Sequence, residues 1–134
     1  MAQGQCNCGA VAFEVSGDLH DVIVCHCSIC RRYTGANGIA VLLVPNADFH
    51  WLHGEDQITT WDKPRAAWQA HFCRNCGSAV PGHNTDGTTY IPAGAIAQDG
   101  EELRVAHHVF VDSRAKWDVI GDDGRQHPDA YGSG

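Results

Sequence analysis

Short apolar runs separated by glycine and other turn residues dominate the chain. Residues 10–15 (AVAFEV) and 21–25 (DVIVC) are rich in Val, Ile and Phe, and Gly9 and Gly17 lie at their edges. Runs of this composition between turn residues are typical of β-strands. We therefore expect two early strands, the second of which ends at Cys25.

The rest of the chain continues this pattern, and no segment carries a long 3.6-residue period. Residues 28–35 allow one helical turn before Gly35, and residues 38–44 form an apolar run, stopped by Pro45, that is typical of a buried strand. The sequence thus predicts an all-β fold of short antiparallel sheets with one or two short helical turns. Further strands are expected at residues 48–54, 57–62, 66–73, 88–96 and 106–113, the first three at the spacing of an antiparallel meander.

Length and charge limit the classes of protein and partner. The 134 residues contain no repeat and no long internal linker, which favours a single domain over residues 1–134 with a loosely ordered, polar tail at residues 121–134. The net charge of −7, with only nine scattered Lys and Arg residues, argues against nucleic acid or an anionic membrane as a partner. Because the chain shows neither a leader-like start nor an apolar stretch of about 20 residues, we expect a cytoplasmic protein. The sequence indicates no oligomeric state.

Seven cysteines add a candidate chemistry to this picture. In a reducing compartment, cysteines favour metal binding or chemistry over disulfides, and an odd number leaves one unpaired in any complete disulfide scheme. Residues two apart on an extended chain point to the same face, so each C-x-C motif offers two sulfurs to one metal ion. The CRNCG motif has the spacing of a metal knuckle, in which Gly77 permits a positive φ. The three groups are Cys6 with Cys8, then Cys25, Cys27 and Cys30, then Cys73 with Cys76.

Zinc is the metal that such sulfur-rich groups favour. Structural zinc takes four thiolates, whereas catalytic zinc typically keeps three protein ligands and one open position. Seven cysteines divide as four plus three, so that the two outer pairs close a four-sulfur site and the central triplet remains open. An iron–sulfur cluster would also take four thiolates, but the familiar ferredoxin spacings are absent.

A histidine is the alternative fourth ligand of the triplet. His26 lies between the first two cysteines of the triplet, where a strand would turn its side chain to the opposite face. His71, His107 and His108 are better candidates. The residues alone leave both an open and a histidine-closed triplet as alternatives.

Four segments resemble one known family. GQCNCGAVAFEV, CHCSICRRYTG, FCRNCGS and HHVFVDSRAKW are similar to segments of the glutathione-dependent formaldehyde-activating enzymes, whose relatives include centromere protein V. The resemblance runs from residue 4 to about residue 117. It implies an Mss-four-like all-β zinc fold, in which Cys6, Cys8, Cys73 and Cys76 hold a structural zinc and Cys25, Cys27 and Cys30 hold a catalytic zinc.

The resemblance also implies an activity. The expected function is that of a zinc-dependent carbon–sulfur lyase, similar to S-(hydroxymethyl)glutathione synthase, with glutathione and formaldehyde as the small-molecule thiol and aldehyde. A zinc with three thiolate ligands suits thiol activation because an incoming thiol can replace water and lose its proton. Two other functions stand beside it: a non-catalytic zinc protein that carries glutathione or a similar thiol, and a structural zinc module that acts through partners.

Side chains next to the triplet are candidates for supporting roles. The guanidinium groups of Arg31 and Arg32 could hold a substrate carboxylate or hydrogen-bond to the cysteine sulfurs. His26 is a candidate proton carrier. The four tryptophans are expected in the core, as large aromatic residues usually are: Trp51, Trp61, Trp68 and Trp117.

Overall fold

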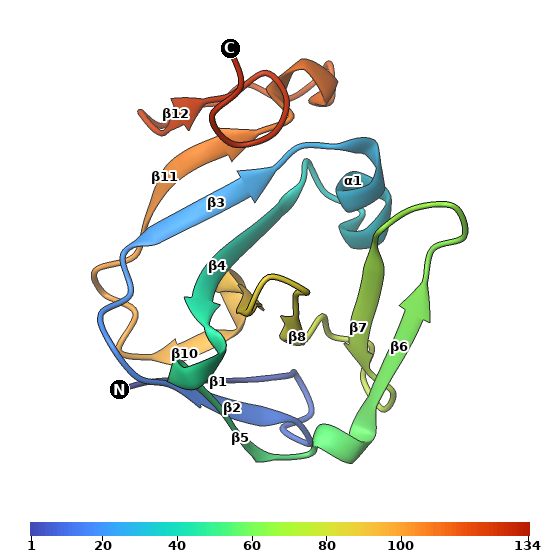
Figure 1. Ribbon diagram of the computed structural model, residues 1–134, viewed down its shortest axis with the longest axis vertical. Helices are drawn as coiled ribbons and strands as arrows, with labels where there is room; N and C mark the ends of the chain where they lie inside the picture. The colour runs from blue at the N-terminus through green and yellow to red at the C-terminus, as the bar shows by residue number, and fades with distance from the viewer. The chain divides into compact units, whose positions relative to one another are not determined.

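The computed structural model describes all residues, 1–134, and is mostly β-sheet with one short α-helix (Figure 1). The fold class expected from the sequence is thereby confirmed. The chain divides into two compact units, one formed by Met1–Leu19 with Leu43–Glu101 and the other by His20–Leu42 with Glu102–Gly134. That residues 1–134 act as one domain remains a prediction. No helix is long and apolar enough to cross a membrane.

The first unit contains a four-stranded antiparallel sheet and two hairpins. The strand order in the sheet is β10-β1-β2-β5, and β6 with β7 and β8 with β9 form the hairpins. Both pairs of the four-cysteine group belong to this unit. The strands are β1 (Ala2–Gln5), β2 (Ala12–Val15), β5 (Phe49–His53), β6 (Ile58–Asp62), β7 (Gln69–Cys73), β8 (Gly82–His83), β9 (Thr88–Pro92) and β10 (Ile96–Gln98).

Aromatic rings pack along the four-stranded sheet of the first unit. The ring centroids of Phe13 and Phe49 lie 5.6 Å apart, and Trp51 meets Phe49 edge-on at 4.8 Å. Gly4 on β1 lies opposite Phe13 on β2, and a Cβ atom at position 4 would collide with the Phe13 ring. Glycine at this position therefore lets the ring pack directly onto β1.

The second unit is built on a mixed sheet. The strands that this unit contributes to the sheet have the order β12-β11-β3-β4, and Figure 1 shows β3 and β11 side by side. β11 runs parallel to both β3 and β12, while β3 and β4 are antiparallel. The parallel pairing departs from the expected antiparallel sheets, because a long stretch of chain separates β3 from β11 and no hairpin joins them. The elements are β3 (Asp21–Cys25), α1 (Ser28–Thr34), β4 (Ile39–Pro45), β11 (Arg104–Val109) and β12 (Arg125–Gln126), and the end of β4 leads into the first unit.

The helix α1 follows β3 almost at once, as the sequence predicts. Gly35 ends α1 with a φ of 71°, and its N–H donates to the Arg31 carbonyl at 2.8 Å. Gly38 then brings the chain against the end of β3, where a Cβ atom would collide with the Cys25 carbonyl oxygen. The lack of a side chain at Gly38 thus allows β4 to begin next to Cys25.

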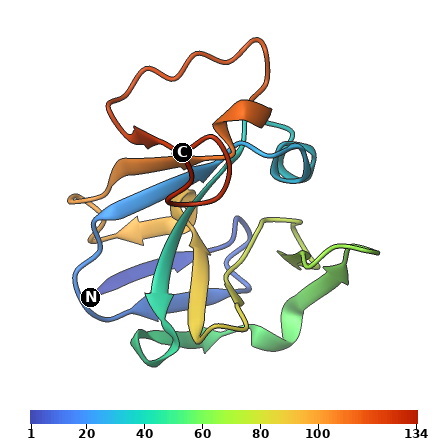
Figure 2. The ribbon, with the colours of Figure 1, turned by 45° about the horizontal axis from the view of Figure 1, so that its top comes forward.

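The C-terminal segment is held by more contacts than its composition predicts. β12 pairs with β11, and the His127 N–H donates to the His108 carbonyl at 2.8 Å (Figure 2). The Phe110 N–H donates to the Asp129 carbonyl at 2.7 Å, and the His127 side chain is buried. The segment thus satisfies backbone groups at the free edge of β11, and a loosely ordered tail at residues 121–134 remains a prediction.

Three further details differ from the sequence prediction. The expected meander of β5, β6 and β7 is wrong, because β5 pairs with β2 and, of these three strands, only β6 and β7 pair with each other. The run at residues 88–96 is interrupted after Pro92, and β4 buries Leu42 but exposes half of Leu43, so it is not buried on both faces. Four 3₁₀ turns add to α1, more than the one or two helical turns expected: Asn46–Asp48, Glu55–Gln57, Ala93–Ala95 and Val111–Ser113.

Candidate metal centres

Four cysteine sulfurs gather in the first unit. The Sγ atoms of Cys6, Cys8, Cys73 and Cys76 all lie within 4.8 Å of one another. Cys8 Sγ is 3.7 Å from Cys6 Sγ and 3.8 Å from Cys73 Sγ, whereas a disulfide needs about 2 Å. Zinc–sulfur bonds of about 2.3 Å in a tetrahedron place the sulfurs about 3.8 Å apart. The four sulfurs therefore have a spacing that fits zinc.

Two similar turns present these sulfurs. The Gly9 N–H donates to the Cys6 carbonyl at 3.1 Å, and the Gly77 N–H donates to the Cys73 carbonyl at 2.7 Å. Both glycines have a positive φ, 79° and 77°, a conformation that is strained for residues with a side chain. The knuckle expected in CRNCG is thus present, and Cys6 and Cys8 lie in a similar turn that ends at Gly9. Cys6 and Cys8 converge through this turn and not through the extended strand expected from the C-x-C spacing.

The four-cysteine group is part of the apolar core on one side. Cys6 and Cys73 are buried in a cluster with Val11 and Val80. The Val11 N–H points to Cys6 Sγ at 3.4 Å, while Cys8 is exposed. A metal ion held here would therefore tie core residues together and face solvent on the other side.

Ser78 links the two turns and was missed by sequence reasoning. Its Oγ accepts a hydrogen bond from the Asn7 N–H at 3.1 Å and lies 3.2 Å from Cys76 Sγ. Hydrogen bonds from the Ser78 hydroxyl and from the backbone N–H groups of Ser78 and Cys8 lower the pKa of Cys76 to about 5, and the hydroxyl contributes most. Because serine has one hydrogen and two lone pairs, it can donate to the Cys76 thiolate and accept from Asn7 at the same time.

The other sulfurs oppose ionisation at Cys8. The Ala10 backbone N–H lowers the pKa of Cys8, but desolvation and the neighbouring thiols outweigh it and raise that pKa to about 11. A cation among the sulfurs would reverse this balance, because an opposite charge favours the thiolate. The protein alone thus stabilises some of the four thiolates, and a metal ion is needed for all of them.

Three further sulfurs gather in the second unit. The Sγ atoms of Cys25, Cys27 and Cys30 lie within 4.8 Å of one another, and no histidine or carboxylate belongs to their group. Cys25 is the last residue of β3, and Cys27 is the N-cap of α1. Cys27 Sγ accepts a hydrogen bond from the Cys30 N–H at 3.4 Å. A strand end and a helix start, one residue apart, therefore bring the three sulfurs together.

One thiolate of the triplet is stabilised by its neighbour. The Cys30 thiol donates to Cys25, which lowers the pKa of Cys25 to about 6 and raises the pKa of Cys30. Cys30 is buried, whereas Cys25 is partly exposed. Before any metal binds, Cys25 is thus the thiolate that the structure favours at neutral pH.

His26 points away from the sulfurs, as the strand geometry predicts. Its side chain is 1% exposed, and its Nε2 lies 2.8 Å from His108 Nδ1. His26 Nδ1 faces Asp118 Oδ2 at 3.6 Å, and His108 Nε2 lies 2.8 Å from Asp122 Oδ1. Two histidines and two carboxylates thus form a row that contains no cysteine.

The other histidines considered as a fourth ligand also have partners elsewhere. His71 Nδ1 lies 2.9 Å from Thr60 Oγ1, and His107 Nδ1 lies 3.1 Å from His127 Nε2. Together with His108, they belong to neither sulfur group. The structure therefore brings no histidine into the triplet.

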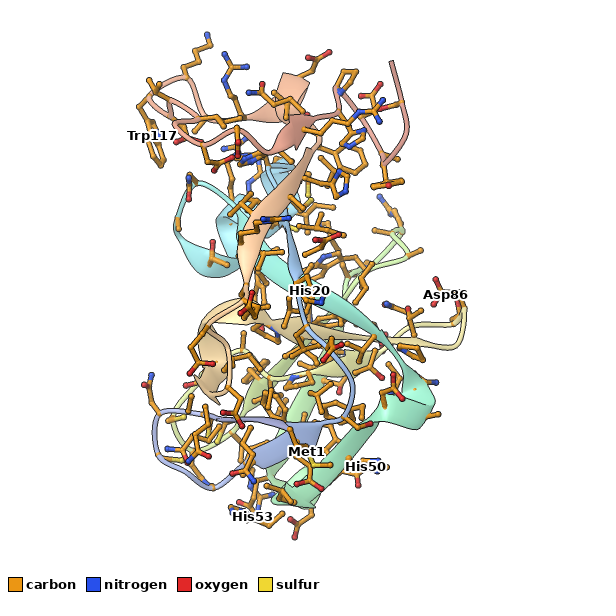
Figure 3. The ribbon with its side chains drawn as sticks, turned by 90° about the vertical axis from the view of Figure 1, so that its left-hand side faces the viewer. Met1, His20, His50, His53, Asp86 and Trp117 are labelled. Atoms are coloured by element: carbon orange, nitrogen blue, oxygen red, sulfur yellow. The ribbon has the colours of Figure 1, made fainter.

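Arg31 braces the loop that carries the triplet, and Arg32 does not. Arg31 Nε donates to the His26 carbonyl at 3.4 Å, whereas Arg32 is exposed. Trp117 is 71% exposed and lies at the edge of Figure 3, and Trp61 is 51% exposed. The expectation that these two tryptophans lie in the core is wrong, because neither is covered by the strands around it.

The family model of the glutathione-dependent formaldehyde-activating enzymes matches residues 1–113, which include all seven cysteines. The chain belongs to this family. The resemblance in its motifs is thereby confirmed. The match covers the cysteines of both sulfur groups and ends shortly after β11.

Two relatives show how far the similarity extends. A protein of Halomonas elongata, provisionally named a glutathione-dependent formaldehyde-activating enzyme, is 35% identical over 85 residues, which are 60% of this chain and 54% of the relative. The chain thus spans about half the length of this curated relative. A crystal structure of a Rhodobacter sphaeroides protein has a TM-score of 0.60 and 22% identity, over 74% of this chain and 91% of that protein. At this identity the likeness supports the fold alone.

Proposed function

We propose that this family member is a zinc-dependent carbon–sulfur lyase that joins a thiol, glutathione, to a small aldehyde, formaldehyde. The observation that carries the proposal is the three-cysteine group, whose sulfurs converge without a fourth protein ligand. A catalytic zinc site typically keeps such an open position. Family membership supports the choice of glutathione and formaldehyde as substrates.

The two sulfur groups have different roles in this proposal. Cys25, Cys27 and Cys30 hold the catalytic zinc, and the four cysteines of the first unit hold a structural zinc. A zinc with three thiolate ligands and one exchangeable position lowers the pKa of an incoming thiol and so supplies a nucleophilic thiolate. The burial of Cys6 and Cys73 among core residues supports the structural role of the four-sulfur group.

The protein's own residues hold the triplet in a fixed arrangement. The His26 N–H donates to the Val109 carbonyl at 3.0 Å, and the His26 carbonyl accepts from Arg31 Nε at 3.4 Å. The residue between Cys25 and Cys27 is therefore held on both sides of its backbone. Such preorganisation lowers the cost of rearranging the site when substrate binds.

The reaction needs no oxidant or reductant. The thiol loses its proton, its sulfur forms a bond to the carbonyl carbon, and the carbonyl oxygen takes up a proton. The product is S-(hydroxymethyl)glutathione, and the reverse reaction breaks the same carbon–sulfur bond. The partly exposed position of Cys25 and Cys27 gives small molecules access to the group.

Metal content and thiol binding, measured together, test this function. We expect two zinc ions per chain in the wild type and one in Cys27→Ala. With cobalt in place of zinc, added glutathione should change the visible spectrum of the wild type and leave that of Cys27→Ala unchanged. Adduct formation should exceed the rate of the unaided reaction and fall to that rate in Cys27→Ala. Full activity in a folded Cys27→Ala protein would overturn the proposal.

The same measurements separate the two alternative functions. Saturable glutathione binding without any rate above the unaided reaction would identify a thiol carrier. Spectra that ignore added thiol would identify a structural zinc protein. Both outcomes contradict the lyase.

The proposal includes the setting in which the protein acts. We place it in the cytoplasm, because all seven cysteines are free and need reducing conditions to remain so. Its partners are a thiol and an aldehyde, with no nucleic acid or membrane surface. Residues 1–134 act as one domain, since the family match at residues 1–113 includes parts of both units.

A further inference from the structure

We propose that a cavity in the second unit binds a small diol, whose two hydroxyl groups donate to His26 and Asp118. The cavity has a volume of about 260 Å³, and no cysteine lines it. One water molecule occupies about 30 Å³, and small-molecule sites begin near 300 Å³. The space is therefore large for a single water and suits a molecule of a few heavy atoms. The proposal does not depend on the lyase activity.

Two buried polar atoms at this cavity have no hydrogen-bond partner. They are His26 Nδ1 and Asp118 Oδ2, and both residues line the cavity. The two atoms are 3.6 Å apart, longer than the ordinary hydrogen-bond range of about 2.7–3.2 Å. Buried polar groups in folded proteins nearly always have a partner, so a bound molecule is the missing partner of both atoms.

The neighbouring hydrogen bonds fix where the hydrogens of the two imidazoles lie. Asp122 Oδ1 accepts from the Gly124 N–H at 2.8 Å and from His108 Nε2 at 2.8 Å. His108 therefore carries its hydrogen on Nε2, and its Nδ1 accepts from His26 Nε2 at 2.8 Å. When both imidazoles are neutral, this arrangement leaves His26 Nδ1 with a lone pair and no hydrogen.

His26 Nδ1 and Asp118 Oδ2 are consequently two acceptors that face each other. Neither can donate to the other, and a ligand that satisfies both must supply two donors. A single hydroxyl group has one hydrogen, whereas a water molecule and a diol each have two, and of these only the diol is large enough for the cavity. An ammonium group also has enough hydrogens, but it would lose its hydration on entry, and it has no carbon chain to contact the apolar side chains that line the cavity beside the polar ones.

The rest of the lining fits the carbon part of such a ligand. Val24 on β3 and Ala40 on β4 lie opposite each other in the sheet and both line the cavity. Val119 and Ile120 line it as well, and Val119 is 87% exposed, which places part of the lining at the surface. A short carbon chain can contact these side chains while its hydroxyl groups reach the two acceptors.

Titration of the zinc-loaded protein with ethylene glycol, followed by ¹H–¹⁵N NMR, tests the proposal. We expect saturable shifts of the backbone amides of Val24, His26 and residues 118–120. The matched probe 1,2-difluoroethane has a similar size and no donors, and it should bind at least tenfold more weakly.

Two variants change the site in independent ways. In Asp118→Asn the side-chain amide can donate directly to His26 Nδ1, so glycol affinity should fall at least tenfold. In Ala40→Leu the larger side chain fills the cavity and leaves the polar atoms unchanged, so saturable binding should be lost. Asp123→Asn is the control, because Asp123 is exposed and does not line the cavity, and it should keep the wild-type affinity.

Several results would overturn the proposal. The first is the absence of saturable shifts with glycol, which would indicate a cavity that holds water alone. The second is equal affinity for glycol and difluoroethane, and the third is tighter binding of ethylammonium than of glycol. Unchanged glycol affinity in a folded Asp118→Asn or Ala40→Leu protein would also overturn the proposal. One of the two variants is enough for this test, provided that it folds. Adduct formation is not used as a readout, and the failure of the lyase function is therefore distinguishable from the failure of this site.

Discussion

The Sγ atoms of Cys8 and Cys73 lie 3.8 Å apart, although 65 residues separate them in the chain. The triplet joins no distant segments, since it is confined to Cys25, Cys27 and Cys30. A metal ion at Cys8 and Cys73 closes a long loop, and closing a loop removes conformational freedom from the unfolded chain. The two sulfur groups should therefore contribute very differently to stability.

Replacement of one cysteine in each group tests this difference. We expect Cys73→Ala to lower the melting temperature more than Cys27→Ala, because Cys73 is fully buried in the core cluster. Structural zinc contributes an apparent 10–16 kcal/mol or so in small zinc domains, and this chain has a larger core, so the loss should be several kcal/mol. Differential scanning calorimetry of both variants, with metal content measured in parallel, gives the comparison. Equal melting temperatures would contradict the division of roles.

The Ser78 hydroxyl should control the reactivity of Cys76. The hydroxyl is the largest of several groups that lower the pKa of Cys76 to about 5, so in the metal-free protein this residue is mostly thiolate at pH 6. Ser78→Ala should raise that pKa and slow alkylation of Cys76 at pH 6 at least tenfold, since the thiolate is the reactive form. Mass spectrometry of the alkylated peptides reports the rate at this one residue. Ser113→Ala, at an exposed serine, should leave it unchanged; an unchanged rate in Ser78→Ala would show that the hydroxyl has no such effect.

His127 should make the fold sensitive to acid. Burial lowers the pKa of His127 below its ordinary 6.5, so the unfolded chain binds a proton there that the folded protein excludes. The free energy of unfolding should consequently be greatest above pH 6.5 and fall as the pH drops towards the folded pKa. Urea denaturation between pH 8 and pH 5 should show a smaller pH dependence in His127→Gln than in the wild type. Metal content measured at each pH separates this effect from loss of zinc, and identical pH profiles would refute it.

Gly38 should be intolerant of a side chain. A Cβ atom at this position would collide with the Cys25 carbonyl, so Gly38→Ala should destabilise the protein by about 1–3 kcal/mol, as overpacking does. The same variant should weaken metal binding by the triplet, because Cys25 must shift. Gly94→Ala is the matched control, since no atom lies within 4 Å of its Cβ position and its φ is not positive. Chemical denaturation of both variants measures the difference, and similar stabilities would show that the chain yields at Gly38 without cost.

The sequence predicts most of the strands, the triplet and the two turns of the four-cysteine group, for a local reason. Strand composition, C-x-C and C-x-x-C spacings and the glycines after Cys8 and Cys76 are all signals within a few residues. The structure shows positive φ values at Gly9 and Gly77 and a helix that starts between Cys27 and Cys30. These elements depend on the conformational preferences of residues that are neighbours in the chain, and such preferences can be predicted from one sequence.

The features that the sequence does not predict depend on distant partners. His26 and His108 are 82 residues apart in the chain, and nothing in either segment indicates that Asp118 and Asp122 complete their row. β12 has only two residues and becomes a strand because β11 offers a free edge. Trp117 is exposed although its size favours burial, because coverage depends on which elements pack there.

The spacing of the cysteines also sets the order in which the two centres can form as the chain is synthesised. The triplet is complete once residue 30 has left the ribosome, and its three ligands need only β3 and the start of α1. Cys6 and Cys8 must wait for Cys73 and Cys76, so for much of synthesis they are two unmatched thiols in the same growing chain as the triplet. Until the CRNCG turn has been synthesised, Cys6 and Cys8 can share a metal ion with cysteines of the triplet. Once Cys73 and Cys76 are available, they can complete the four-cysteine group with Cys6 and Cys8.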